Sequence, residues 1–292
     1  MVVRSTGTFC ASRGVRHPGN DMPGGGVAPF LAKFSGAAAA YSLRQLNNDG
    51  NFNVVKVRRG SDDTVRDFTA GEVANGTLGL FIGAGDGFVE VWYDQSGNGL
   101  HAAQPVTSKQ PKIANNGSII TAGGVAAIDF DGVSDWLATS GYMVELSANT
   151  DVQIAIVYGS AETPSATNYV LVESDLSEPY YSSQFIVGSI GSQSDVLWVN
   201  ADVFGTAPPT RYLAGFQKTG ANGQAYVNGA VSGASAALVI NSEVGDATYI
   251  GASANGGATA QYQGTVQELI VYHHNNNDIT RYATEQVAYY NL

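Results

Sequence analysis

The chain has 292 residues, of which 44% are apolar and 13% are charged, and its formal net charge is −11. The ordinary apolar share excludes a disordered chain, and this length suits one all-β domain with a large core. The shortage of Lys and Arg excludes nucleic acid as a partner, because phosphate binding needs clustered cations. Cys10 is the single cysteine, so no intrachain disulfide can form and stability must come from packing.

The first 36 residues differ in composition from the rest of the chain. They contain three prolines and the glycine run 24–26, with little apolar periodicity. We therefore expect an extended arm over 1–36 that is ordered only against a partner, followed by one domain over 37–292. No apolar run reaches the roughly 20 residues of a membrane span, and the first residues lack the apolar core of a secretory signal. We expect neither membrane insertion nor export by the secretory route.

Two short helices are predicted to flank a long β-region. Four consecutive alanines, with Leu43 and Leu46 at helical spacing, predict a helix over 37–46. A second helix is predicted from Asp278, a favourable N-cap residue, because apolar residues recur at helical spacing over 279–290.

Between these helices the apolar residues recur with a period of two. The clearest example is 152–158, where Val152, Ile154, Ile156 and Tyr158 share a face. Asn228-Gly229 predicts a two-residue hairpin turn, because both positions tolerate positive φ. Further strands are predicted over 52–58, 88–93, 125–130, 169–173, 184–187, 196–200, 212–218, 224–227, 248–251 and 266–272. Many short strands separated by turns predict a sandwich or barrel.

Several stretches resemble known proteins when they are taken in order. The most specific is Trp-Tyr-Asp-Gln-Ser-Gly-Asn-Gly at 92–99. The others lie at 40–44, 57–62, 110–113 and 128–132. This order resembles the jelly-roll catalytic domain of α-L-arabinofuranosidase B. It is more similar still to concanavalin A-like, laminin G-like modules of bacteriophage tail and head-surface proteins.

The resemblance implies an all-β, two-sheet antiparallel jelly-roll sandwich of the concanavalin A-like type over 37–292. Such domains commonly bind carbohydrate, and only some members hydrolyse it. The cysteines of the arabinofuranosidase are absent here, and its catalytic carboxylates have no evident counterpart. These departures weaken an enzymatic interpretation more than they weaken the fold.

The segment 93–99 has two interpretations. Asp94 could accept backbone N–H groups of its own turn, with Gly97 and Gly99 supplying positive φ. Alternatively, Asp94 and Asn98 could bind sugar hydroxyls while the ring of Tyr93 stacks on the sugar. Tyr180 and Tyr181, which adjoin a predicted loop, are further candidates for an exposed sugar contact.

Two acidic segments offer other chemistry. Asp129, Asp131 and Asp135 are closely spaced oxygen donors of the kind that calcium prefers, although Asp131-Gly132 also reads as a plain turn. No other cofactor is expected.

Glu173 and Asp175 belong to an E-x-D-x-x-E stretch similar to that of jelly-roll glucanases, in which two carboxylates share a strand face. Here Pro179 follows the stretch directly, and serines replace the apolar residues that would desolvate an acid. The sequence therefore favours a protein that is not an enzyme.

We predict a bacteriophage virion surface protein, such as a tail fibre, a knob or a capsid decoration. Residues 1–36 would bind other virion proteins, and the lectin-like domain would recognise a host surface glycan. The protein could also assemble as a homo-oligomer. Two alternatives stay open. One is a glycoside hydrolase acting on a surface polysaccharide, and the other is a purely structural decoration protein without a ligand.

Overall fold

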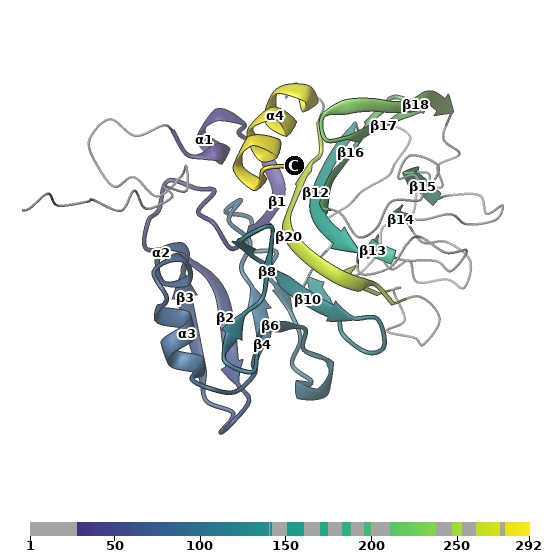
Figure 1. Cartoon of the computed structure of the whole chain (residues 1–292). Helices are drawn as coiled ribbons and strands as arrows, with labels where there is room; N and C mark the ends of the chain where they lie inside the picture. The colour runs from purple at the N-terminus through teal and green to yellow at the C-terminus, as the bar shows by residue number, and fades with distance from the viewer. Residues whose placement is uncertain are drawn as a thin grey trace, which may run out of the picture.

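The computed structural model describes residues 28–139, 141, 151–160, 170–174, 183–187, 196–199, 211–237, 247–252, 261–274 and 278–292. These residues form two layers of mainly antiparallel strands, with a few short helices against them (Figure 1). The predicted all-β sandwich is confirmed. Within the described part of the chain, no helix is long and apolar enough to cross a membrane.

The first layer is built around β20 (Gln263–Tyr272). On one edge of β20, four strands follow one another in antiparallel order: β12 (Val152–Ser160), β16 (Arg211–Thr219), β17 (Asn222–Val227) and β18 (Ala230–Ala237). The opposite edge of β20 is shared by two strands. β10 (Ile128–Asp131) pairs with the first part of β20, and β1 (Ala37–Ser42) pairs with the last part.

The second layer begins at β2 (Asn53–Arg59), which pairs with β3 (Val65–Thr69) and β4 (Gly87–Trp92). The other edge of β4 is likewise shared by two strands. Its first residues pair with β6 (Lys112–Asn115), which leads into β10 and so joins the two layers. Its last residues pair with β5 (Ala102–Ala103), after which the layer continues through β11 (Leu137–Thr139), β19 (Thr248–Ile250), β13 (Val170–Ser174), β14 (Ser183–Val187) and β15 (Val196–Val199).

The remaining elements are short. They are α1 (Phe30–Lys33), α2 (Ala70–Ala74), α3 (Thr77–Ile82), the 3-10 helix η1 (Thr107–Lys109), β7 (Ser118–Ile119), β8 (Thr121–Ala122), β9 (Val125–Ala126) and α4 (Ile279–Tyr290). Helices α2 and α3 lie beside β2 and β3, whereas α1 and α4 lie together near β1 and β20 (Figure 1).

The central strands of the first layer, β12 and the last part of β20, are buried on both faces. In β12, Ile154 and Ile156 belong to the main core between the layers, as the period-two pattern predicted. Ala155 and Val157 belong to a second core beneath α1 and α4. The predicted C-terminal helix is confirmed as α4, and the Asp278 side chain caps it by accepting hydrogen bonds from the backbone N–H of Thr280 and Arg281.

The predicted helix over 37–46 is wrong, because its alanines form β1. Ala39 faces the main core and Ala40 faces the second core, and both are fully buried. Ladder pairing with β20 and burial of both faces outweigh the high helix propensity of alanine. Residues 28–36, which we assigned to the arm, pack on the domain: Phe30 and Phe34 contact the ring of Tyr282 in α4.

Buried glutamine side chains bind backbone groups where neighbouring strands diverge. The Gln267 Nε2 group lies between the partners β10 and β1 of β20, and it donates to the carbonyls of Ala122, Val125 and Ala126 at 3.0–3.4 Å. At the corresponding division of β4, Gln110 donates to the Gln104 carbonyl at 2.8 Å. These amides supply donors that the interrupted ladders would otherwise leave missing.

An ion pair joins Glu268 of β20 to Arg44, which follows β1, and side chains of α4 bond to the same carboxylate. Arg44 Nε lies 2.7 Å from Glu268 Oε2, and the Glu268 side chain is 0% exposed. Gln286 and Tyr290 of α4 donate to the same carboxylate at 2.9 and 3.0 Å. Burial would raise the pKa of Glu268, but the charge and hydrogen bonds of Arg44 lower it overall. The carboxylate is therefore held ionised by partners from two elements.

We expect Glu268→Ala to reduce the free energy of unfolding by about 3–5 kcal/mol, because it leaves the Arg44 guanidinium buried without its partner. Urea unfolding followed by fluorescence measures this. The matched control is Lys33→Ala, which breaks the partly exposed pair with Glu285 and should cost about 1 kcal/mol or less. Equal losses for the two variants would contradict the role of the buried pair.

Candidate functional site

One row of residues crosses the outer face of the second layer. Successive strands place Lys56 opposite Val91, Val91 opposite Ala103, Ala103 opposite Ala138, and Ala138 opposite Tyr249. Directly opposed residues of an antiparallel pair lie on the same face of a sheet. The neighbouring residues Trp92, Ala102 and Ile250 belong to the main core, so this row faces away from the core.

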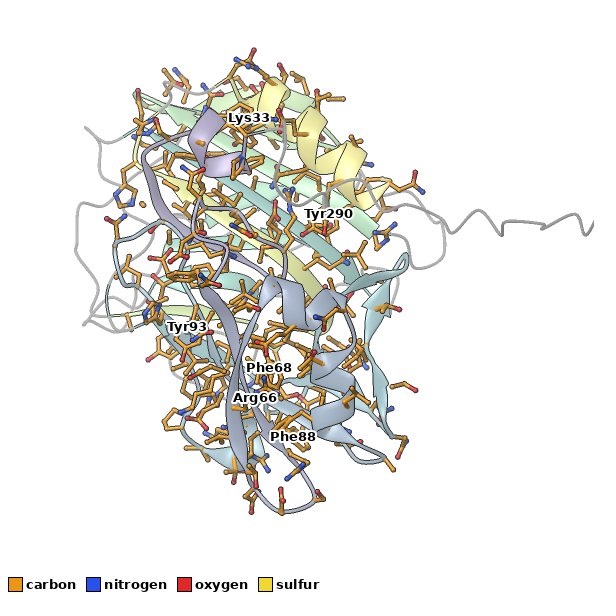
Figure 2. All side chains as sticks on the ribbon, turned by 90° about the vertical axis from the view of Figure 1, so that its left-hand side faces the viewer. Lys33, Arg66, Phe68, Phe88, Tyr93 and Tyr290 are labelled. Carbon is orange, nitrogen blue, oxygen red and sulfur yellow. The ribbon has the colours of Figure 1, made fainter. Side chains whose placement is uncertain are left out.

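Ala103 and Ala138, two small residues that stand opposite each other, have aromatic side chains on either side of them. Trp136 packs on Tyr249 with ring centroids 5.4 Å apart, and Lys109 Nζ lies 5.6 Å from the Trp136 centroid. Two residues before Ala103, His101 packs edge-on against Tyr93 at 5.0 Å. We call Tyr93, His101, Trp136 and Tyr249 the aromatic face. Figure 2 shows Tyr93 at the edge of the molecule, away from Tyr290 beneath α4.

The structure places Asp94 inside its own turn. Its side chain is 1% exposed, and it accepts hydrogen bonds from the backbone N–H groups of Ala40, Ser96 and Leu100 at 2.9–3.1 Å. The Asn98 amide donates to the carbonyls of Ala37 and Ala38 at 3.0 Å. The structural interpretation of this segment therefore accounts for both side chains, which fasten the turn to β1.

Tyr93 is only partly buried, whereas Trp92 before it and Asp94 after it are buried. Its hydroxyl donates to Asp67 Oδ1 at 2.7 Å. Burial, and then the hydrogen bond to Asp67, raises the pKa of this hydroxyl. A role in sugar binding stays a prediction for Tyr93, Asp94 and Asn98. Tyr180 and Tyr181 lie outside the described residues.

Asp94→Ala should lower the free energy of unfolding by about 3 kcal/mol or more, because buried N–H donors of β1 and the turn would lose their acceptor. Thermal or urea unfolding measures the loss. Asp49→Ala removes an exposed turn carboxylate that accepts only from Asn51 N–H, and it should cost about 0.5 kcal/mol. An Asp94→Ala variant as stable as the wild type would show that the turn does not need this carboxylate.

The three aspartates predicted as calcium ligands lie on β10 and the loop after it. Asp131 Oδ1 accepts from the backbone N–H groups of Val133, Ser134 and Asp135 at 2.8–3.1 Å. Asp129 stands opposite Lys112 in the β10–β6 ladder. Among the residues that the structure describes, no three His, Cys, Asp or Glu side chains are grouped to hold a metal ion. The geometry thus lends no support to calcium, whose binding stays a prediction.

Asp135 is the carboxyl group in this cluster with the most unusual acidity. It is 7% exposed and directly precedes Trp136 of the aromatic face. Burial, and then the negative charge of Asp131, raises the pKa of Asp135 to about 7. At neutral pH this carboxyl group is present in both protonation states, which is the property required of a general acid.

Because the pKa of Asp135 is higher in the folded state, the unfolded chain binds fewer protons between about pH 4 and 7, and stability falls as the pH rises through this range. Asp135→Asn should remove this dependence. At pH 8 it should raise the free energy of unfolding by up to about 4 kcal/mol, because the wild type must then ionise a carboxyl group whose pKa is about 7 in the folded state. Urea unfolding from pH 4 to 8 measures the difference. Parallel curves for the two proteins would contradict the raised pKa.

Sequence reasoning located Tyr93 and Asp135 but missed His101, Lys109, Trp136 and Tyr249. The sequence signal that could have found Trp136 is its spacing from Ala138. The two residues are two positions apart in a segment between predicted strands, so they would share a face if that segment were a strand. Glu173 stands opposite Tyr249 in the β13–β19 ladder, which places its backbone at one end of the same row. Asp175 and Glu178 lie outside the described residues.

Comparison with known proteins gives relatives by structure alone. No family model matches the sequence, and no curated protein matches it. An arabinofuranosidase complexed with arabinofuranosyl-α-1,2-xylobiose matches 90% of this chain at a TM-score of 0.61 and 15% identity. A mutant of GH54 α-L-arabinofuranosidase soaked with 4-nitrophenyl α-L-arabinofuranoside matches 89% of the chain at a TM-score of 0.59 and 15% identity. GH54 α-L-arabinofuranosidase soaked with a cyclic sulfate inhibitor also matches 89%, at a TM-score of 0.60 and 16% identity.

This chain spans 64–65% of the length of those arabinofuranosidases. At 15–16% identity the likeness establishes a shared fold. It supports the predicted resemblance to a jelly-roll glycoside hydrolase, and the comparisons give no support to the resemblance to bacteriophage modules.

The prediction of a non-enzymatic bacteriophage virion protein is wrong on these comparisons. The three solved structures described above, which match about 90% of the chain, are arabinofuranosidases, and nothing in the comparisons points to a bacteriophage. The prediction depended on the resemblance to bacteriophage modules, on the lack of a secretory signal and of disulfides, and on a composition change near residue 36. A jelly-roll enzyme can share those features, because function resides in sites rather than in folds.

Proposed function

We propose that this chain is a glycoside hydrolase domain whose substrate lies across the aromatic face. The observation that carries the proposal is the Asp135 carboxyl, which has a pKa of about 7 and belongs to the residue directly before Trp136 of the aromatic face. Glycosidases need one carboxyl group that is protonated near neutral pH, held close to a surface that binds sugar. The shared fold with arabinofuranosidases supports the same assignment.

The aromatic face suits a neutral polysaccharide. Rings of Trp, Tyr and His offer apolar surface to the C–H faces of sugars, while their polar atoms bond to hydroxyl groups. The two alanines between the aromatic pairs leave the middle of the row without a bulky side chain. Because the arabinofuranosidase relatives hold arabinofuranosyl compounds, we assign an arabinofuranose-substituted polysaccharide as the substrate.

The reaction requires two carboxyl groups with different roles. Protonated Asp135 would give its proton to the glycosidic oxygen as the bond from that oxygen to the anomeric carbon breaks. A carboxylate must then attack the anomeric carbon or remove a proton from the attacking water. We assign this role to the Glu173–Asp175 segment, because it carries two carboxyl groups and the backbone of Glu173 pairs with Tyr249 in the β13–β19 ladder.

The test is hydrolysis of 4-nitrophenyl α-L-arabinofuranoside and of an arabinose-substituted xylo-oligosaccharide by the purified chain. Asp135→Asn should lower kcat/KM by about 10²–10⁴-fold, the usual contribution of a general acid. Glu173→Gln or Asp175→Asn, whichever removes the second carboxylate, should have an effect at least as large. Wild-type kcat/KM should fall as the pH rises above about 7, because Asp135 must be protonated.

The matched control is Asp49→Asn, an exposed aspartate in the turn before β2, which should leave hydrolysis unchanged. Absence of hydrolysis by the wild type on both substrates would overturn the proposal. So would full activity of Asp135→Asn, because the proton would then come from another group.

A further inference from the structure

His101 is held in a single orientation by the turn that precedes it. The backbone N–H of Asp94 donates to His101 Nδ1 at 3.1 Å. That N–H cannot turn away, because the Asp94 carboxylate is itself bonded to Ala40, Ser96 and Leu100. Nδ1 is therefore the acceptor of the ring, and Nε2 carries the proton.

Nε2 of His101 has no hydrogen-bond partner among the described residues, so one oriented N–H donor is available on the aromatic face. Acceptors lie next to it. The Tyr93 ring packs edge-on against the imidazole at an interplanar angle of 84°, and its hydroxyl donates to Asp67. The Tyr93 oxygen keeps acceptor capacity, and the Asp67 carboxylate is exposed.

This combination matches the hydroxyl groups of a sugar. Adjacent hydroxyls can each donate and accept, so they fit a site that presents a fixed donor beside fixed acceptors. The cation nearest to this group along the sheet, Lys56, is paired with Glu90 at 2.6 Å. The Asp67 carboxylate therefore keeps its negative charge beside this group, which favours a neutral sugar over an anionic one.

The position of the pair suits a subsite separate from Asp135. His101 precedes Ala103 by two residues and Trp136 precedes Ala138 by two, while Ala103 and Ala138 are opposed on antiparallel strands. His101 and Trp136 are thus displaced by four residues along the strands, or about 13 Å. A ligand that contacts both pairs must be an oligosaccharide.

We propose that Tyr93 and His101 form a distal subsite that binds vicinal hydroxyls of a neutral sugar unit, and that Asp94 positions this pair without touching the ligand. The proposal takes its substrate class from the proposed function but does not require catalysis. It accounts for the Tyr-Asp-Gln-Ser-Gly-Asn-Gly segment as a scaffold for one imidazole and one phenol.

The test is calorimetric binding of an arabinose-substituted xylo-oligosaccharide to the full chain. His101→Asn keeps an acceptor near the Nδ1 position for the Asp94 N–H but removes the Nε2 donor, and Tyr93→Phe keeps the ring but removes the hydroxyl. Each should weaken binding by about tenfold, the effect of one lost hydrogen bond to a ligand. The free energy of unfolding in urea should be unchanged in both variants, which separates a lost ligand contact from a destabilised fold.

His273→Asn, at the far end of β20, is the matched control and should bind as the wild type does. Wild-type binding without hydrolysis would reject the proposed catalysis and leave the subsite standing. Unchanged affinity in both His101→Asn and Tyr93→Phe would overturn the subsite, as would failure of the wild type to bind the oligosaccharide. If His101→Asn proves unstable, Tyr93→Phe decides alone, because its ring packing is preserved.

Discussion

The hydrogen-bond ladder of β20 is the constraint on which both layers depend. This strand pairs with β12 along one edge and with β10 and β1 on the other, so its register sets the position of strands from distant parts of the chain. A shared edge has a cost, because backbone groups between the two partners lose their ladder bonds. At this gap the Gln267 carbonyl accepts from the hydroxyls of Ser42 and Tyr290, and the Gln267 side chain donates to carbonyls of β8 and β9. Glu268, the next residue, bonds the same point to Arg44 and α4. The polar residues of this strand are therefore structural, although their burial could suggest chemistry.

The edge of β4 that β5 and β6 share has a different consequence, because it leads to the aromatic face rather than to a buried contact. Where β5 replaces β6 as its neighbour, the layer turns into β11 and β19. The row that follows has alanines at its centre and aromatic pairs on both sides. The Asp94 turn contributes to both regions, since its carboxylate binds β1 while its backbone N–H orients His101. One turn thus connects the stability of the first layer with the geometry of the second.

Local patterns in the sequence predicted much of the fold. The alternation over 152–158 predicted β12, and Asn228-Gly229 predicted a turn that has φ values of 48° and 81°. The alanines of β1 misled, because their conformation is decided by a partner more than 200 residues away and not by propensity. The site was less accessible still. Tyr93 and Asp135 carry local signals, whereas Tyr249 joins Trp136 only through the pairing of β11 with β19, which a single sequence does not reveal.

The pairing of β1 with β20 also determines when this domain can fold. Arg44 and Glu268 are separated by 224 residues, and the second core needs Tyr282 and Tyr290 beside Phe30. During synthesis the first strand must therefore wait, with its apolar faces uncovered, until almost all of the remaining strands have left the ribosome. Non-local contacts of this kind slow folding and prolong exposure of unpaired edges. A holdase chaperone that covers 37–46 should improve the yield of native protein more than one that acts on the hairpin of β16 and β17.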